Sequence, residues 1–216
     1  MFRPLTSNVA FLVFAAPLCA GQADLGLIGG FGVPAASATA SLGGTSATAG
    51  FQQGEGLGVL VGTNSSNIIG GDLRYLLLFD DLKLSRGGSN VTFGSRSHLI
   101  HYDLLIHARA RGYSIRPFVA AGGGIRYVEG TGAQQVYQPL SEYALLTQTR
   151  EVLPLVSAGG GIKFRMTRRL DLRIEVRDFM SPHPTKVIAA SPGASLHGWI
   201  HEITPMAELV YVFRSE

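Results

Sequence analysis

The sequence predicts an all-β protein, an eight-stranded antiparallel up-and-down transmembrane β-barrel. Three observations support this fold class: short segments in which apolar and polar residues alternate, a glycine-rich segment that occurs twice, and an N-terminal segment typical of exported proteins. Only 15% of the residues are charged, and the mean hydropathy is +0.22. Beyond the N-terminal segment, no stretch approaches the roughly 18 uninterrupted apolar residues of a spanning helix. Apolar character spread over short alternating segments is typical of membrane barrels.

The first 23 residues are predicted to form a secretory signal peptide. Arg3 gives a short positive start, and Val9–Ala16 form an apolar core that is too short to span a membrane. The favoured cleavage follows Ala23, and a cut after Ala20 is the alternative. Either cut removes Cys19, the only cysteine. The mature chain therefore has no disulfide and no thiol chemistry, although it is exported.

One segment occurs twice, and both copies are predicted to be strands. Residues 117–127 (PFVAAGGGIRY) return as residues 154–164 (PLVSAGGGIKF). Read with period two, one face of each copy is apolar and ends in an aromatic residue. The other face carries small residues and one basic residue, Arg126 or Lys163. Such a segment suits a strand between lipid and a crowded polar lumen. The outward residues are Val119, Ala121, Ile125 and Tyr127 in the first copy and Val156, Ala158, Ile162 and Phe164 in the second.

Six further segments complete about eight predicted strands. Four of them alternate clearly, at residues 72–81, 99–110, 170–179 and 199–213. Glycine-rich segments at 24–33 and 55–63 also fit strands. The predicted outward faces are Leu73, Tyr75, Leu77 and Phe79; Ile100, Tyr102, Leu104, Ile106 and Ala108; Leu170, Leu172, Ile174 and Val176; and Trp199, Ile203, Ala207, Leu209, Tyr211 and Phe213.

Short and long connections alternate along the chain, as an up-and-down barrel requires. The short turns fall at residues 65–67, 111–113 and 167–169, and the long loops at 34–51, 84–97, 129–153 and 181–198. Within the third loop, residues 139–149 have some helical spacing, which allows a short helix. No linker marks a second domain, so residues 24–216 are predicted to form one barrel domain.

Charges of both signs occupy the predicted inward faces in equal number. The positive residues are Arg74, Arg109, Arg126, Lys163, Arg165, Arg173 and Arg177, and the negative residues are Asp72, Asp80, Asp103, Asp171, Glu175, Glu202 and Glu208. An eight-stranded barrel has an interior just wide enough for side chains to fill. Unpaired buried charges are costly. The balance therefore predicts a closed lumen cross-linked by ion pairs.

Aromatic residues near the strand ends predict two girdles at the membrane interfaces. Phe79, Tyr127, Phe179 and Trp199 lie beside the long loops, and Phe164, Tyr211 and Phe213 lie near the other rim.

No catalytic residue, cofactor site or metal site is predicted. His98, His101 and His107 accompany Asp103, but His101 and His107 would lie about 20 Å apart on one strand, too far to share an ion. Lumen histidines that hydrogen-bond to carboxylates are the favoured interpretation. The triple glycines do not complete G-x-G-x-x-G, because Tyr127 and Phe164 replace the last glycine. The remaining histidines, His183, His197 and His201, gather around the last long loop, where solvated side chains are favoured over a surface metal site.

With these features the chain resembles the small outer-membrane β-barrel superfamily, comprising the OmpA-type membrane domain and its opacity-protein and OmpX relatives. The resemblance rests on the export signal, the strand and loop rhythm, the repeated Pro-x-Val-x-Ala-Gly-Gly-Gly segments and the aromatic-rich last strand. It implies a bacterial outer-membrane location. It does not imply one activity, since this scaffold hosts adhesins, solute proteins, lipid enzymes and anchors. The chain departs from the family in that Arg214-Ser215-Glu216 follow the aromatic Phe213.

The expected function is therefore that of a non-enzymatic outer-membrane protein, with a role in envelope integrity or in surface interaction through its long loops. The expected partners are outer-membrane lipid, lipopolysaccharide and an external ligand or surface, and a monomer is the expected state. A nucleic-acid partner is not expected, because the chain is exported and its basic residues are not expected to cluster into a patch.

Three alternatives remain. The first is a narrow solute pore. The second is a lipid A-modifying enzyme, for which the sequence offers Ser97-His98 and His201-Glu202 but no His-x-Ser motif. The third is a soluble lipocalin-like carrier, which would need an apolar interior where this chain places charges.

Overall fold

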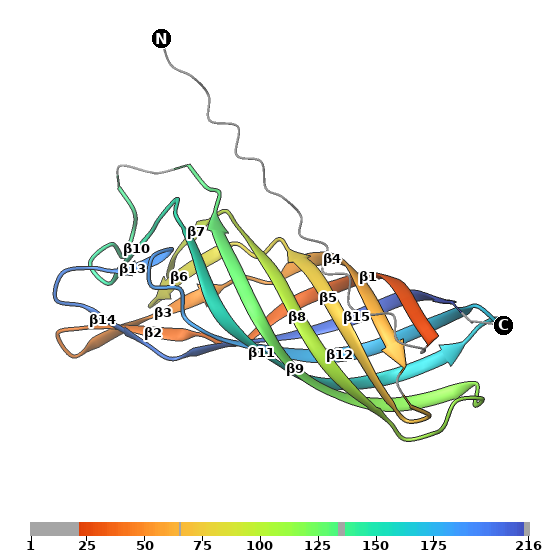
Figure 1. Ribbon diagram of the computed structural model, residues 1–216. Helices are drawn as coiled ribbons and strands as arrows, with labels where there is room; N and C mark the ends of the chain where they lie inside the picture. The colour runs from red at the N-terminus through yellow and green to blue at the C-terminus, as the bar shows by residue number, and fades with distance from the viewer. Residues whose placement is uncertain (1–21, 65, 134–136, 214–216) are drawn as a thin grey trace, which may run out of the picture.

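The computed structural model describes residues 22–64, 66–133 and 137–213, and its main body is a closed antiparallel β-barrel (Figure 1). The strand order β1-β15-β12-β11-β9-β8-β5-β4 confirms the predicted eight-stranded up-and-down barrel. With 10 to 16 residues each, these strands are long enough to cross a membrane at a tilt. Their bounds are β1 (Gln22–Ala36), β4 (Gly54–Asn64), β5 (Ile69–Leu78), β8 (Ser95–His107), β9 (Ile115–Gly130), β11 (Arg150–Arg165), β12 (Leu170–Pro182) and β15 (Trp199–Phe213).

The predicted signal peptide lies outside the described residues, apart from its last two positions. Gln22 and Ala23 begin β1, where Ala23 pairs with Thr63 on one side and with Phe213 on the other. The cleavage after Ala23 stays a prediction.

The outer wall of the barrel is apolar on every strand. Outward residues such as Leu27 (66% exposed), Val119 (61%) and Leu57 (64%) are not buried in the core of the protein. Exposed apolar area of this extent marks a surface that another apolar phase covers. The belt comprises Leu25, Leu27, Leu57, Val59, Val61, Leu73, Ile100, Tyr102, Leu104, Ile106, Val119, Ile125, Val152, Val156, Ile162, Ile174, Val176 and Leu209.

The two copies of the repeated segment are neighbouring strands, β9 and β11, which pair antiparallel from Ile115↔Phe164 to Glu129↔Arg150. Their inward glycines leave room for large side chains of adjacent strands. A Cβ on Gly161 would lie 2.6 Å from the Glu175 Cβ, and one on Gly159 would lie 2.8 Å from the Arg177 Cδ. Glycine is therefore required here by close approach, which explains why both copies carry it.

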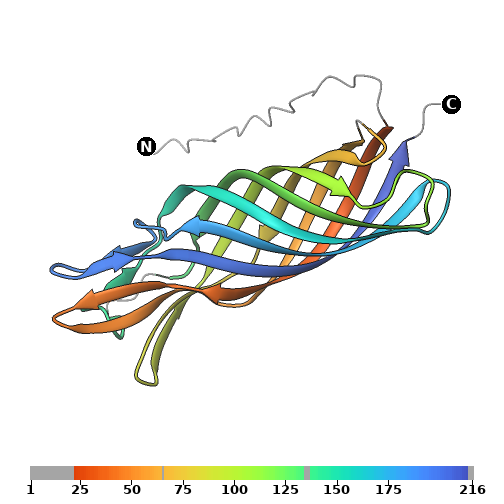
Figure 2. The same cartoon turned by 90° about the horizontal axis from the view of Figure 1, so that it is seen from below.

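The long connections are themselves folded, at the end of the barrel opposite the C-terminus (Figures 1 and 2). They form a five-stranded sheet in the order β14-β2-β3-β6-β7 and a two-stranded sheet of β10 and β13. We call this part the cap. Its strands are β2 (Ala38–Leu42), β3 (Thr45–Phe51), β6 (Leu82–Arg86), β7 (Ser89–Phe93), β10 (Ala144–Leu146), β13 (Ile188–Ala190) and β14 (Ser195–His197).

The helix considered for residues 139–149 is wrong. These residues contain the short strand β10, in which Ala144 and Leu146 are buried and Leu145 is 39% exposed. That alternation has the period of a strand, and the pairing with β13 satisfies its backbone. Among the described residues no helix is long and apolar enough to span a membrane.

Two tight hairpin turns shape the cap. Leu42 and Thr45 are joined by Gly43 and Gly44, and Arg86 and Ser89 by Gly87 and Gly88, so each turn has two residues. All four glycines have positive φ, between 54° and 84°. Two consecutive positive φ values match the twist of the flanking strands and strongly favour glycine.

The cap has its own apolar core, which continues into the mouth of the barrel. Tyr143, in the third long loop, contacts each of the other three. Its hydroxyl lies 2.8 Å from the Thr45 Oγ1, its ring centroid lies 4.9 Å from the Arg86 guanidinium, and its carbonyl accepts a hydrogen bond from the Ser191 amide. The loops are therefore one packed unit. The buried core comprises Ala40, Ala47, Ala49, Phe51, Leu82, Leu84, Phe93, Val128, Tyr143, Ala144, Leu146, Leu153, Val187, Ile188 and Ile200.

Candidate functional site: an ion-paired lumen beneath a polar cap sheet

Arg74 is the centre of the ion-pair network that fills the lumen. It projects inward from β5 and is 2% exposed. Its guanidinium lies 2.7 Å from the Glu208 carboxylate, 3.1 Å from Asp72 and 3.5 Å from Asp103, and it donates a short hydrogen bond to Glu175. Four carboxylates from four strands thus converge on one guanidinium. Its planar fork of donors suits such multiple pairing.

Two further arginines from β12 extend this network. Arg173 lies 2.6 Å from the Asp72 carboxylate and 3.1 Å from that of Asp24. Arg177 lies 3.1 Å from the Asp103 carboxylate. Because each carboxylate is shared between cations, the strands β1, β5, β8, β12 and β15 are cross-linked through the lumen.

A second cluster closes the lumen under the cap. Arg126, from β9, is fully buried and lies 2.5 Å from the Asp80 carboxylate and 2.9 Å from that of Glu202. It also donates to the Ser97 hydroxyl at 3.1 Å. The ring of Phe51 from the cap core stacks over its guanidinium at 4.2 Å. Arg126 therefore links the cap core to the ion pairs of the lumen.

The predicted set of inward charges is largely confirmed. Eleven of the fourteen residues are buried, whereas Arg109 is exposed and Arg165 and Asp171 are half-buried. Arg109 lies two residues beyond the end of β8, so alternation no longer fixes its direction, and Arg165 and Asp171 lie at strand ends. The structure adds Asp24 and Arg116 to the buried set, giving seven carboxylates against six Lys and Arg side chains. Asp24 and Arg116 were missed because the alternation of apolar and polar residues is least visible in their segments.

The interior is also partly apolar, although the inward faces were predicted to be charged. Besides the ions, the barrel encloses Ile28, Leu60, Leu76, Leu78, Leu99, Leu155, Phe179, Met206 and Val210.

Phe179 corrects the predicted aromatic girdle. It is fully buried and contacts the His101 ring edge-to-face, with the centroids 5.2 Å apart. The alternation of β12 already requires this, because Phe179 shares its parity with the inward Arg173, Glu175 and Arg177. The other six aromatic residues are exposed or half-buried on the outer wall. They are Phe79, Tyr127, Phe164, Trp199 (51% exposed), Tyr211 (38%) and Phe213 (51%).

Trp199 offers a direct test of the outer girdle. We expect bromine carried on lipid chains to quench the fluorescence of this sole tryptophan in reconstituted protein, because its ring lies on the outer wall beside the cap. Quenching by aqueous iodide alone would contradict the girdle.

The histidines do not form a shared site. His101 lies 3.0 Å from the Asp103 carboxylate inside the lumen, and the His107 Nδ1 lies 3.2 Å from the Ile68 carbonyl oxygen. His98 is on the outer wall, 2.8 Å from the Tyr75 hydroxyl. Among the described residues no group of three or more His, Cys, Asp or Glu side chains could hold a metal ion.

The candidate catalytic pairs are separated by the sheet. Ser97 is buried and donates to the Asp80 carboxylate at 2.7 Å, whereas His98 faces outward. Glu202 pairs with Arg126 in the lumen, whereas His201 faces outward and lies 3.0 Å from the Asp178 carboxylate. In neither pair, therefore, do the two side chains lie on the same side of the sheet.

The outer face of the five-stranded cap sheet is the most distinctive exposed surface. One register row crosses all five strands and carries a polar side chain at each position: His197, Thr39, Thr48, Ser85 and Asn90. The opposite face of the sheet is apolar and covers the cap core, with Ala38, Ala49 and Leu84 fully buried. The sheet is therefore strongly amphipathic.

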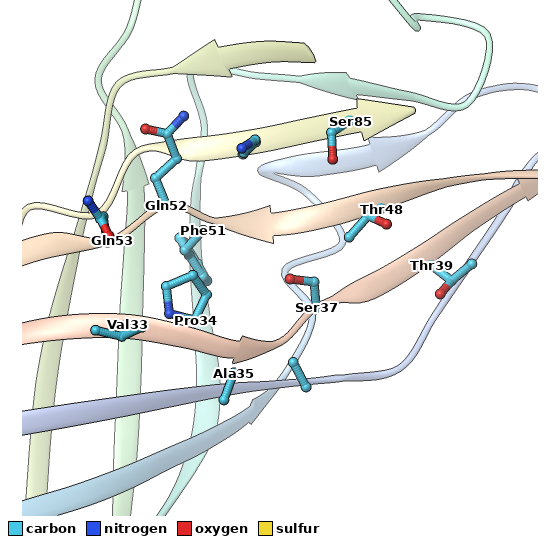
Figure 3. A pocket seen from close by; sticks show the side chains of 12 residues that line it. Val33, Pro34, Ala35, Ser37, Thr39, Thr48, Phe51, Gln52, Gln53 and Ser85 are labelled. Carbon is cyan, nitrogen blue, oxygen red and sulfur yellow. The ribbon is translucent and has the colours of Figure 1, made fainter. Parts of the chain in front are cut away.

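A pocket of about 720 Å³ lies at the foot of this sheet, where β1 passes into β2 (Figure 3). Hydroxyl and amide side chains line it, namely Ser37, Thr39, Thr48, Gln52, Gln53 and Ser85, and Lys83 is its one charged residue. Val33, Pro34 and Phe51 are among its apolar lining residues. This chemistry suits a polar, uncharged ligand.

No protein-family model matches the sequence, and no curated protein matches it. Solved structures do match. The structure of Neisserial surface protein A (NspA) has a TM-score of 0.54 at 11% identity, with 88% of this chain and 99% of that chain covered. The N-terminal β-barrel domain of Pseudomonas aeruginosa OprF has a TM-score of 0.45 at 13% identity, covering 89% and 99%. The attachment invasion locus protein Ail of Yersinia pestis has a TM-score of 0.48 at 9% identity, covering 89% and 99%.

The likeness to NspA concerns the fold. Together with the closed eight-stranded topology and the apolar outer wall, it shows that the chain has the architecture of small outer-membrane β-barrels, the class that the sequence predicts.

Proposed function

We propose that this protein is a non-enzymatic outer-membrane protein that presents its cap sheet at the cell surface for interaction with a polar external ligand. The observation that carries this proposal is the packed cap. Its loops bury an apolar core of their own and hold the row from His197 to Asn90 on a rigid, amphipathic sheet. Ordered loops on a rigid scaffold are typical of binding surfaces.

The short turns and the C-terminal strand end lie opposite the cap, so the usual orientation of such barrels directs the cap outward from the cell. The ligand class favoured by the pocket is a polysaccharide, because hydroxyl and amide side chains recognise sugar hydroxyls without requiring charge. Lipopolysaccharide and outer-membrane lipid would then surround the apolar outer wall of the barrel.

The enzyme and pore alternatives receive less support. The separation of Ser97 from His98 argues against a serine–histidine mechanism of the kind considered from the sequence. The buried network around Arg74 and the cluster around Arg126 argue against a solute path. We infer a monomer, because a complete barrel leaves no open barrel edge for a partner.

The orientation is testable with single cysteines, since Cys19 falls in the predicted signal peptide. We expect Ser46→Cys, on the exposed part of β3, to react with a membrane-impermeant maleimide on intact cells. Ser114→Cys, in the β8–β9 turn, is expected to react only after the outer membrane is permeabilised. The reverse pattern would place the cap in the periplasm and contradict the proposal.

Binding is tested with the full mature chain in nanodiscs on an array of neutral polysaccharides. We expect the wild-type protein to bind, and the Thr39→Lys/Thr48→Lys variant, which places two long charged side chains in the polar row, to lose this binding. The control Ser66→Lys, in the β4–β5 turn at the other end of the barrel, is expected to keep it. Equal binding by both variants would contradict a role for the sheet.

A further inference from the structure

The barrel carries a strongly basic surface at the end opposite the cap. We call it the turn surface, and its residues are Arg109, Arg111, Arg165, Arg168 and Arg169, all exposed or half-buried, with the buried Arg116 directly beneath them. They come from two turns that lie about 50 residues apart in sequence. The turns meet because β9 pairs with β11: the Arg165 amide donates to the Ser114 carbonyl at 2.8 Å, and its guanidinium donates to the Gly112 carbonyl at 2.9 Å. The sequence-based view that basic residues do not cluster is therefore wrong.

Little negative charge offsets the turn surface. Beneath this surface, Arg111, Arg165 and Arg173 repel the buried Arg116 as like charges, whereas Asp171 attracts it. Within the described ranges, Arg109, Arg116, Arg165, Arg168 and Arg169 form no salt bridge. The hydrogen-bond acceptors of these guanidiniums are neutral: Arg116 donates to two backbone carbonyls, and Arg169 donates to the Tyr211 hydroxyl at 3.3 Å.

Interfacial side chains surround these arginines. Tyr113 is 57% exposed, with the Arg109 guanidinium 5.7 Å from its ring centroid, and Met166 (58%) and Ile115 (47%) add exposed apolar area. A mixture of tyrosine, apolar side chains and arginine is typical of the boundary between hydrocarbon and headgroups. A protein partner in free solution would not account for the exposed apolar residues at the same rim.

We propose that the turn surface binds the phosphate groups of anionic phospholipids in the periplasmic leaflet of the outer membrane. All five cations are arginines, whose planar forks match phosphate oxygens with two parallel hydrogen bonds. Each basic residue near an anionic membrane surface adds attraction, so a cluster of five gives a marked preference. The inference rests on the proposed outer-membrane location and orientation and adds a second, lipid-binding surface to the protein.

The test compares lipid association in reconstituted full-length mature protein by electron spin resonance of spin-labelled phosphatidylglycerol and phosphatidylcholine. We expect wild-type protein to prefer phosphatidylglycerol by about threefold or more, and the preference to weaken as salt is added. The Arg109→Gln/Arg168→Gln/Arg169→Gln variant removes three exposed guanidiniums and is expected to lose most of the preference.

The matched control removes three exposed arginines from the cap side, in Arg86→Gln/Arg96→Gln/Arg150→Gln. Arg150 already pairs with Glu129 at 2.9 Å, and Arg96 lies opposite Glu129 in the ladder, so this variant is expected to keep the preference. Equal loss in both variants, or no preference in the wild type, would overturn the inference.

Two further arms separate the outcomes. Replacing chloride by inorganic phosphate at constant ionic strength is expected to leave the preference unchanged, and its collapse would assign the surface to small anions instead of headgroups. Heat-modifiable gel mobility verifies insertion before each measurement. A wild-type chain that fails to insert would contradict the proposed function, whereas insertion without lipid preference would contradict only this inference.

Discussion

Replacing Arg74 with alanine is expected to lower the free energy of unfolding by about 3–5 kcal/mol, the cost of leaving buried charges without their partner. The substitution leaves the carboxylates of Asp72, Asp103, Glu175 and Glu208 close together in a lumen where Arg74 lies against all four. Their mutual repulsion then adds to their desolvation. Urea unfolding of the protein in phosphatidylcholine vesicles, followed by heat-modifiable mobility, measures the effect.

Arg150→Ala is the matched control. Arg150 also forms a salt bridge, with Glu129 at 2.9 Å, but its side chain is 68% exposed. Exposed pairs contribute about 0–1 kcal/mol, so the control should change stability little. Arg173→Ala and Glu175→Ala should resemble Arg74→Ala, because each breaks the same network. A loss for Arg74→Ala no larger than that for Arg150→Ala would refute a lumen held by ion pairs.

The second large effect is expected for Phe51→Ala, at the contact between cap and barrel. Phe51 is 3% exposed, belongs to the cap core and covers the Arg126 guanidinium at 4.2 Å. Removing a buried phenyl ring costs about 3–5 kcal/mol through lost transfer energy and the cavity left behind. We expect the cap to open before the barrel unfolds, which limited proteolysis of reconstituted protein would show as cleavage confined to the cap.

Tyr137→Ala provides the control for this experiment, because Tyr137 is an aromatic residue of the third loop that is 76% exposed. Its removal should change stability by less than about 0.5 kcal/mol and leave the cap resistant to protease. Rapid cap cleavage in Tyr137→Ala, or none in Phe51→Ala, would show that the cap is not held by its apolar core.

The barrel itself could be predicted because its signal is local. Alternation along residues 170–177 fixes the outward and inward faces of β12 without knowledge of its neighbours, and the same holds for β8 and β15. The error at Phe179 arose where the position beside a long loop was weighed above strand parity. The parity was correct.

The cap could not be predicted from apolar content, since alanine and threonine alternate weakly in ATASL and TSATAGF. The usable signal was the Gly-Gly pair in each hairpin, which indicates a two-residue turn between paired strands. The ion pairs within the lumen could not be predicted from the sequence for another reason. Arg74 and Glu208 are 134 residues apart, and only barrel closure makes them neighbours. The arginines of the turn surface are likewise brought together by a long-range contact, the pairing of β9 with β11.

Conductance in planar lipid bilayers tests most directly whether the lumen is closed. The network around Arg74 and the Arg126 cluster beneath Phe51 predict that purified, heat-modifiable protein shows no steady current. The result should hold at either polarity, because cations and carboxylates in the lumen are nearly balanced. Stable, reproducible single-channel steps from the wild-type protein would contradict the closed lumen and favour the narrow solute pore.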